Sequence, residues 1–118
     1  MHLGTIVIID AKIEEKDQSL LNDPTYLNRT LEALTIVCGL TKVNECIHKF
    51  EPQGYTICHV LAESHISIHT WPEESSFAMD IYSCKHDLDI EEIKTTLKQF
   101  FPNTILINTQ KTHRCISI

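Results

Sequence analysis

The sequence has few glycines, no cluster of basic residues and no segment of low complexity. Only three of its 118 residues are glycine, and no motif repeats at a fixed period, so collagen-like, linker-like and solenoid chains are excluded. Sixteen acidic against ten basic residues give a formal net charge of −6. Without a group of lysines and arginines to neutralise phosphates, we expect no nucleic-acid partner. The length and ordinary composition predict one domain.

The sequence also lacks the apolar segments that secretion and membrane insertion require. The apolar run at residues 6–9 follows no basic residues and ends at Asp10, so it predicts a strand rather than a signal peptide. Nothing approaches the ~20 apolar residues of a membrane span. The five cysteines form no C-x-x-C pair. We therefore predict reduced thiols in a cytoplasmic protein with no membrane contact.

Helix and strand signals alternate along the chain. Asp23 and Pro24 are typical of a helix start and Gly39 of its end, and Asp89 predicts a second helix over residues 90–101. Strands are expected at residues 4–12, 41–50, 55–62, 65–71, 76–84, 103–108 and 113–118. The helices are far apart in sequence with hairpin-like strand runs between them. This order predicts an α+β fold, a two-layer sandwich with an antiparallel sheet and two helices on one face.

Residues 62–73, AESHISIHTWPE, are unusually rich in reactive side chains. His65 and His69 have the spacing that places two zinc ligands on one face of a helix. The alternation of Ile66, Ser67 and Ile68 favours a strand instead. At ~3.3 Å per residue, a strand separates the two imidazoles by about 13 Å, too far to share a metal ion. We therefore expect no metal site.

The simplest interpretation of this segment is a half-buried strand with Ile66 and Ile68 inward and its polar side chains outward. It explains the alternation. It does not explain Glu63-Ser64 before the strand or Trp71-Pro72-Glu73 after it.

The string ESHISIHTWPE is followed eleven residues later by Cys84, and it lies between HKFEPQGYT at 48–56 and FAMDIYSC at 77–84. Together these segments resemble the prokaryotic S-adenosylmethionine decarboxylase family, pyruvoyl-dependent enzymes of spermidine (polyamine) biosynthesis. The resemblance implies a carboxy-lyase made as a zymogen. The Glu63–Ser64 bond would break by autocatalytic cleavage into a β chain, 1–63, and an α chain, 64–118. Ser64 would become the pyruvoyl cofactor, which binds substrate as a Schiff base.

The resemblance also implies roles for other residues. His69 matches the histidine that removes a proton during processing, and Thr56 occupies the position of a serine whose hydroxyl assists it. Cys84 matches the proton donor of decarboxylation. Phe50 matches the aromatic side chain that stacks on adenine, with core packing as the alternative. Glu73 matches the carboxylate that binds the ribose hydroxyls, with a solvated turn carboxylate as the alternative.

The spacing of Ser64 and His69 bears on whether the protein forms a dimer. Ser64 and His69 differ by five residues, so on a continuous strand they face opposite sides. Either the strand is broken near Ser64 or a partner supplies His69. The family forms homodimers whose sites draw residues from both protomers, which implies Ser64 and Cys84 from one protomer and His69, Phe50 and Glu73 from the other.

The resemblance has departures. Family members usually have Gly, a basic residue and His where this chain has Gly4-Thr5-Ile6, and a glycine where it has Ile57. Cys58 and His59 replace the usual aliphatic residues. Two alternatives to S-adenosylmethionine decarboxylation therefore stay open: decarboxylation of ornithine or arginine by the same chemistry, and an unprocessed paralogue with a regulatory role.

Overall fold

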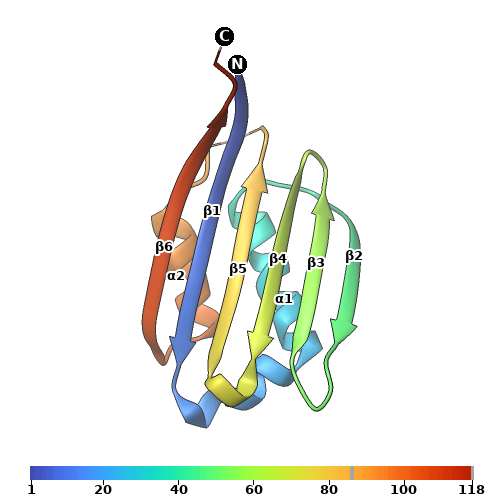
Figure 1. The fold of residues 1–118 in the computed structure, drawn as a ribbon, viewed down its shortest axis with the longest axis vertical. Helices are drawn as coiled ribbons and strands as arrows, with labels where there is room; N and C mark the ends of the chain where they lie inside the picture. The colour runs from blue at the N-terminus through green and yellow to red at the C-terminus, as the bar shows by residue number, and fades with distance from the viewer. Residues whose placement is uncertain (86, 118) are drawn as a thin grey trace.

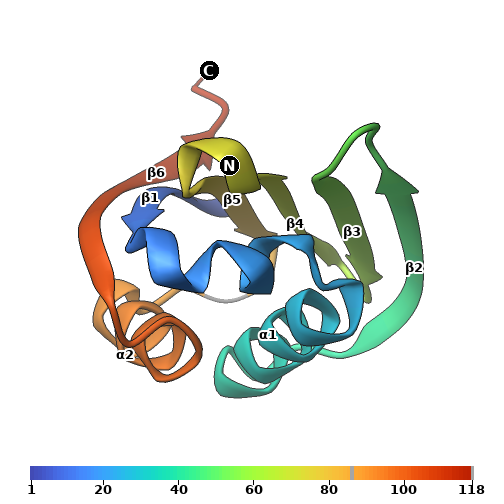
Figure 2. The same cartoon turned by 90° about the horizontal axis from the view of Figure 1, so that it is seen from below.

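A computed structural model describes residues 1–85 and 87–117 of the chain. Its elements, in order, are β1 (His2–Ile13), the 3-10 helix η1 (Glu15–Asn22), α1 (Pro24–Val37), β2 (Lys42–Lys49), β3 (Tyr55–Leu61), β4 (Ser64–Trp71), the 3-10 helix η2 (Pro72–Glu74), β5 (Ser76–Ser83), α2 (Ile90–Phe100) and β6 (Thr104–Cys115). The strands form one antiparallel sheet in the order β2-β3-β4-β5-β1-β6. Both α-helices lie on the same face of it (Figures 1 and 2). The predicted two-layer α+β sandwich is confirmed.

Both helices begin where their capping residues predict. The Asp23 carboxylate accepts a hydrogen bond from the backbone N–H of Tyr26, and the Asp89 carboxylate accepts from Glu91 and Glu92. These bonds satisfy N–H groups that have no partner within the helix. The apolar faces of the helices then pack on the sheet. Their fully or nearly fully buried side chains are Leu27, Leu31, Leu34, Ile93 and Leu97.

The C-terminal part of the prediction is wrong. Residues 104–115 form one twelve-residue strand, β6, rather than two strands. It pairs with β1 along its length, from Ile13 opposite Thr104 to His2 opposite Cys115. The polar residues 109–112 do not interrupt it, because β6 is an edge strand whose side chains are largely exposed. Ile118, the last residue of the strand predicted at 113–118, lies outside the described residues.

The predicted alternation of β4 is confirmed. Ile66 and Ile68 are buried towards the helices, whereas His69 and Trp71 are exposed on the other face, which no helix of the described ranges covers. The strand is continuous from Ser64, which shares the parity of Ile66 and therefore faces the helices. Ser64 and His69 thus lie on opposite faces of one unbroken strand.

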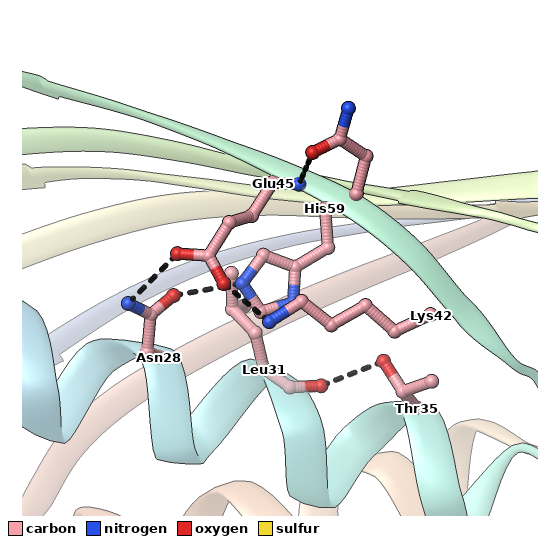
Figure 3. Close-up of polar contacts among 7 residues, drawn as sticks. Asn28, Leu31, Thr35, Lys42, Glu45 and His59 are labelled. Carbon is pink, nitrogen blue, oxygen red and sulfur yellow. Dashed lines mark hydrogen bonds and ion pairs between the residues drawn. The ribbon is translucent and has the colours of Figure 1, made fainter.

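A polar contact joins β3 to α1 (Figure 3). The fully buried His59 places Nε2 2.7 Å from Oδ1 of Asn28, whose amide donates to Glu45 on β2 at 3.5 Å. Glu45 also pairs with Lys42. Burial, followed by the nearby Lys42 charge, lowers the pKa of His59 below its ordinary value. The ring is therefore neutral near pH 7 and donates to Asn28 through Nε2–H.

Candidate active site

The β2–β3 hairpin and the end of β4 border an open pocket of about 480 Å³. Its lining includes four of the residues that the sequence singled out, Phe50, Thr56, His69 and Glu73. They come together because the antiparallel register places Thr56 directly opposite His69, while the hairpin and η2 bring Phe50 and Glu73 to the same end of the sheet. This size suits a ligand of several tens of atoms.

The histidine of this pocket is held by a neighbouring hydroxyl. Thr56 Oγ1 lies 2.9 Å from Nδ1 of His69, and the His69 side chain is exposed on the uncovered face. A hydrogen bond at one ring nitrogen orients the imidazole and leaves Nε2 for proton transfer. Threonine therefore keeps the contact that a serine at position 56 would make.

The two predicted substrate-binding side chains are available to a ligand. Phe50 is 45% exposed at the end of the hairpin, where the His48 ring packs edge-on against it at 4.8 Å, so the alternative of core packing is wrong. Glu73 is exposed on η2, and its carboxylate accepts a hydrogen bond from the Gln53 side chain at 3.1 Å. Gln53 thus fixes the orientation of Glu73 within the pocket.

A second cluster lies at the other end of β4. The hairpin between β3 and β4 turns at Glu63, whose φ of 84° is left-handed and costs a non-glycine residue about 1–3 kcal/mol. The carbonyl oxygen of Glu63 accepts a hydrogen bond from the backbone N–H of Cys84 at 3.2 Å, and the Cys84 sulfur lies 2.6 Å from the same oxygen. Two donors of one residue therefore polarise one carbonyl group.

The hydroxyl beside that carbonyl is unusual. Ser64 Oγ is buried and has no hydrogen-bond partner among the described residues. Ser64 lines a small cavity of about 60 Å³ together with Thr41 and Lys85. This buried hydroxyl is next to a polarised carbonyl at a strained turn. It is therefore placed to attack the peptide bond between Glu63 and Ser64. These residues fit a serine that is converted into a pyruvoyl group.

One chain does not bring the two clusters together. Ser64 and His69 are five residues apart on the continuous β4, about 16 Å at ~3.3 Å per residue, and on opposite faces. Glu63, Ser64 and Cys84 form one cluster, and Phe50, Thr56, His69 and Glu73 form the other.

Sequence reasoning missed three residues near these clusters. Gln53 lies in the segment HKFEPQGYT but had no assigned role, because nothing local indicates its bond to Glu73. Asn22 accepts a hydrogen bond from the backbone N–H of Gly54. Gly4 packs so closely on β5 that an added Cβ would lie 2.3 Å from the carbonyl oxygen of Ser83 and 2.8 Å from Cα of Cys84. Only its φ of 127° and the missing side chain permit this approach.

Residues 1–85 and 87–117 show neither a cluster of metal ligands nor a membrane-spanning helix. No group of three or more His, Cys, Asp and Glu side chains there is arranged to hold a metal ion. No helix of this part of the chain is long and apolar enough to cross a membrane. All five cysteines are free thiols.

Comparison with known proteins shows the family of the chain. A family model described as S-adenosylmethionine decarboxylase matches residues 6–114. The S-adenosylmethionine decarboxylase proenzyme of Methanococcus aeolicus is 40% identical over 84% of this chain and 83% of its own length. That of Synechococcus sp. WH7803 is 47% identical over 58% of this chain and 53% of its own length. The crystal structure of the adenosylmethionine decarboxylase of Aquifex aeolicus superposes with a TM-score of 0.81 at 25% identity, covering 99% of this chain and 94% of that one. This chain belongs to the S-adenosylmethionine decarboxylase family.

Proposed function

We propose that this chain cleaves itself between Glu63 and Ser64 and then, as a homodimer, decarboxylates S-adenosylmethionine at sites built from both protomers. Membership of the family makes the chain a decarboxylase whose cofactor is a self-derived pyruvoyl group. The residues that perform each step are inferred from the two clusters. The observation that carries the proposal is the Glu63 carbonyl, which accepts from two donors of Cys84. It lies beside the buried hydroxyl of Ser64, which has no hydrogen-bond partner in the described part of the chain.

Self-cleavage begins at that carbonyl. The Ser64 oxygen attacks the carbonyl carbon of Glu63 while the Cys84 N–H and S–H stabilise the negative charge on its oxygen. The peptide C–N bond breaks, the hydroxyl proton passes to the nitrogen, and an ester replaces the amide. Relief of the left-handed conformation at Glu63 favours this step.

The ester then eliminates. A base removes the Cα proton of residue 64, and the ester C–O bond breaks to leave a carboxylate at Glu63 and a dehydroalanine. Water hydrolyses the tautomeric imine, which releases ammonia and leaves the pyruvoyl group at the new N-terminus. His69, oriented by Thr56, is the base with a free ring nitrogen on the uncovered face.

The separation of the clusters supports a dimer. Because Ser64 and His69 lie five residues, about 16 Å, apart along one unbroken strand, His69 of the partner subunit is the one that would act at residue 64. Each site would then combine Ser64 and Cys84 of one protomer with the pocket of the other. The uncovered sheet face, which carries exposed His69 and Trp71, is the surface available for this association.

The pocket would bind the nucleoside part of the substrate. Phe50 offers an exposed ring for adenine, and the Glu73 carboxylate, held by Gln53, accepts from the ribose hydroxyls. The pyruvoyl group supplies an electron sink for the electron pair that the departing carboxylate leaves behind. Cys84, adjacent to residue 64, donates the proton that the substrate carbon then takes up.

Intact mass is the first test. The purified chain should yield fragments 1–63 and 64–118, the second resistant to Edman degradation. Release of CO₂ should occur with S-adenosylmethionine and not with ornithine or arginine. A single uncleaved 13.5 kDa species after prolonged incubation would contradict the proposal.

Complementation tests the shared site. Ser64→Ala and His69→Ala chains should each stay uncleaved when expressed alone. Co-expression should produce mixed dimers with one intact site, in which the His69→Ala chain is cleaved. Random pairing predicts about a quarter of the wild-type sites. No cleavage after co-expression, with mixed dimers present, would refute the assignment of sites to both protomers.

A further inference from the structure

We propose that Asn22 is a positioning residue for the substrate pocket, although it does not line the cavity. From the end of η1, its side chain holds the β2–β3 hairpin in the conformation that forms one wall of the pocket. The inference rests on the proposed function, because it identifies a residue that acts through the substrate-binding loop.

Hydrogen bonds at Gly54 hold the β2–β3 hairpin in place. Asn22 Oδ1 accepts from the backbone N–H of Gly54 at 2.9 Å, and the Gly54 carbonyl accepts from the backbone N–H of Phe50 at 2.8 Å. Gly54 has a φ of 102°, and a Cβ there would lie 2.8 Å from the carbonyl oxygen of Thr70. The Gly54 backbone is therefore fixed between Asn22 and β4, and Phe50 is bonded directly to it.

The end of η1, which carries Asn22, is itself held in place by hydrogen bonds. The buried Thr70 hydroxyl donates to the carbonyl of Leu21 at 2.8 Å and accepts from the backbone N–H of Tyr55 at 2.9 Å. This hydroxyl connects η1 to both strands that border the pocket. Asn22 is exposed, so it can be changed without opening a cavity in the core.

Loss of this bond should affect binding rather than chemistry. Without an acceptor at position 22, the backbone N–H of Gly54 would donate its hydrogen bond to water instead, and residues 51–53 would adopt alternative conformations. Phe50 and Gln53 then lose the preorganisation that substrate binding uses. The Glu63–Ser64–Cys84 cluster at the other end of β4 is not touched.

The test is a comparison of three variants. Asn22→Ala should raise KM for S-adenosylmethionine about fivefold with kcat and the cleavage rate unchanged, as expected for loss of one hydrogen bond. Asn22→Asp keeps an acceptor oxygen and should restore KM. Asp23→Ala is the matched control: the neighbouring residue caps α1 through Tyr26, so its loss should lower Tm without changing KM.

A binding measurement gives a second readout. Calorimetric titration of uncleaved Ser64→Ala chains with S-adenosylmethionine should show the same weakening when Asn22→Ala is added. An unchanged KM in Asn22→Ala, or an equal rise in Asp23→Ala, would overturn the inference and leave the proposed function standing. Failure of the wild-type chain to cleave or to release CO₂ would overturn the proposed function, and the inference with it.

Discussion

The two ends of β4 differ in how they are prepared for chemistry. At its start, the Glu63–Ser64 bond lies at a left-handed residue, beside a buried hydroxyl and a carbonyl with two donors from Cys84. At its end, His69 lies in an open pocket of exposed side chains. In the proposed function, the first end reacts within the chain and the second binds a ligand from outside. A rigid strand keeps these two environments apart, so a single sequence segment serves both.

The largest effect is expected from Ser64→Ala, which should abolish the chemistry at the start of β4 and leave ligand binding at its end unchanged. Ser64→Ala removes the attacking oxygen, so the chain should remain uncleaved and show no decarboxylation. The distant pocket should still bind S-adenosylmethionine with Kd within about twofold of the uncleaved wild-type chain. Mass spectrometry and calorimetry measure the two results. Cleavage of this variant at position 63 would refute the role of Ser64.

Cys84→Ala should affect the first end less severely. The backbone N–H of Cys84 remains to polarise the Glu63 carbonyl, so the chain should still cleave, about tenfold more slowly. Decarboxylation by the cleaved enzyme should fall by about 10²–10⁴, because the proton donor is gone. Mass spectra of samples quenched at successive times measure the cleavage rate, and CO₂ release by the cleaved enzyme measures decarboxylation. Full turnover would show that Cys84 is not the donor.

Thr56→Val tests the orientation of His69 at the second end. Valine removes the hydroxyl at 2.9 Å from Nδ1 but keeps the shape of the side chain. Cleavage should slow about tenfold, while Thr56→Ser should restore it. The first-order cleavage rate of freshly translated chain is the measurement. An unchanged rate in the valine variant would mean that the ring needs no support from residue 56.

The smallest effect should come from His59 on β3, which lies in neither cluster. The pKa of His59 is lowered from 6.5 in the folded chain, so the unfolded chain binds a proton at a higher pH than the folded chain does. The stability due to neutral His59 is thus complete above pH 6.5 and declines as pH falls through the lowered pKa.

His59→Gln keeps a donor for Asn28 without titrating in this range. Urea unfolding at about pH 7.5 and about pH 5.5 should show a smaller loss of stability in the variant than in the wild type. Cleavage and substrate binding should not change, since His59 lies in neither cluster. An equal loss in both proteins would show that His59 does not contribute to the acid sensitivity.

Local signals predicted most of the fold. The caps at Asp23 and Asp89 and the alternation around Ile66 depend on neighbours within a few residues, and each prediction is confirmed. The prediction of two strands at the C-terminus is wrong because pairing with β1 continues through a polar stretch. The roles given to the site residues from the motif stay predictions.

The sequence by itself determined the alternation of β4, the positions of the helices and the chemical groups that the motif contains. Those properties follow from backbone sterics, from hydrogen bonds to nearby residues and from the period of a strand. Only the tertiary structure decided that Cys84 contacts the Glu63 carbonyl and that Asn22 holds Gly54. These contacts join residues far apart in the chain, and they arise from the packing of strands and helices that no local pattern encodes.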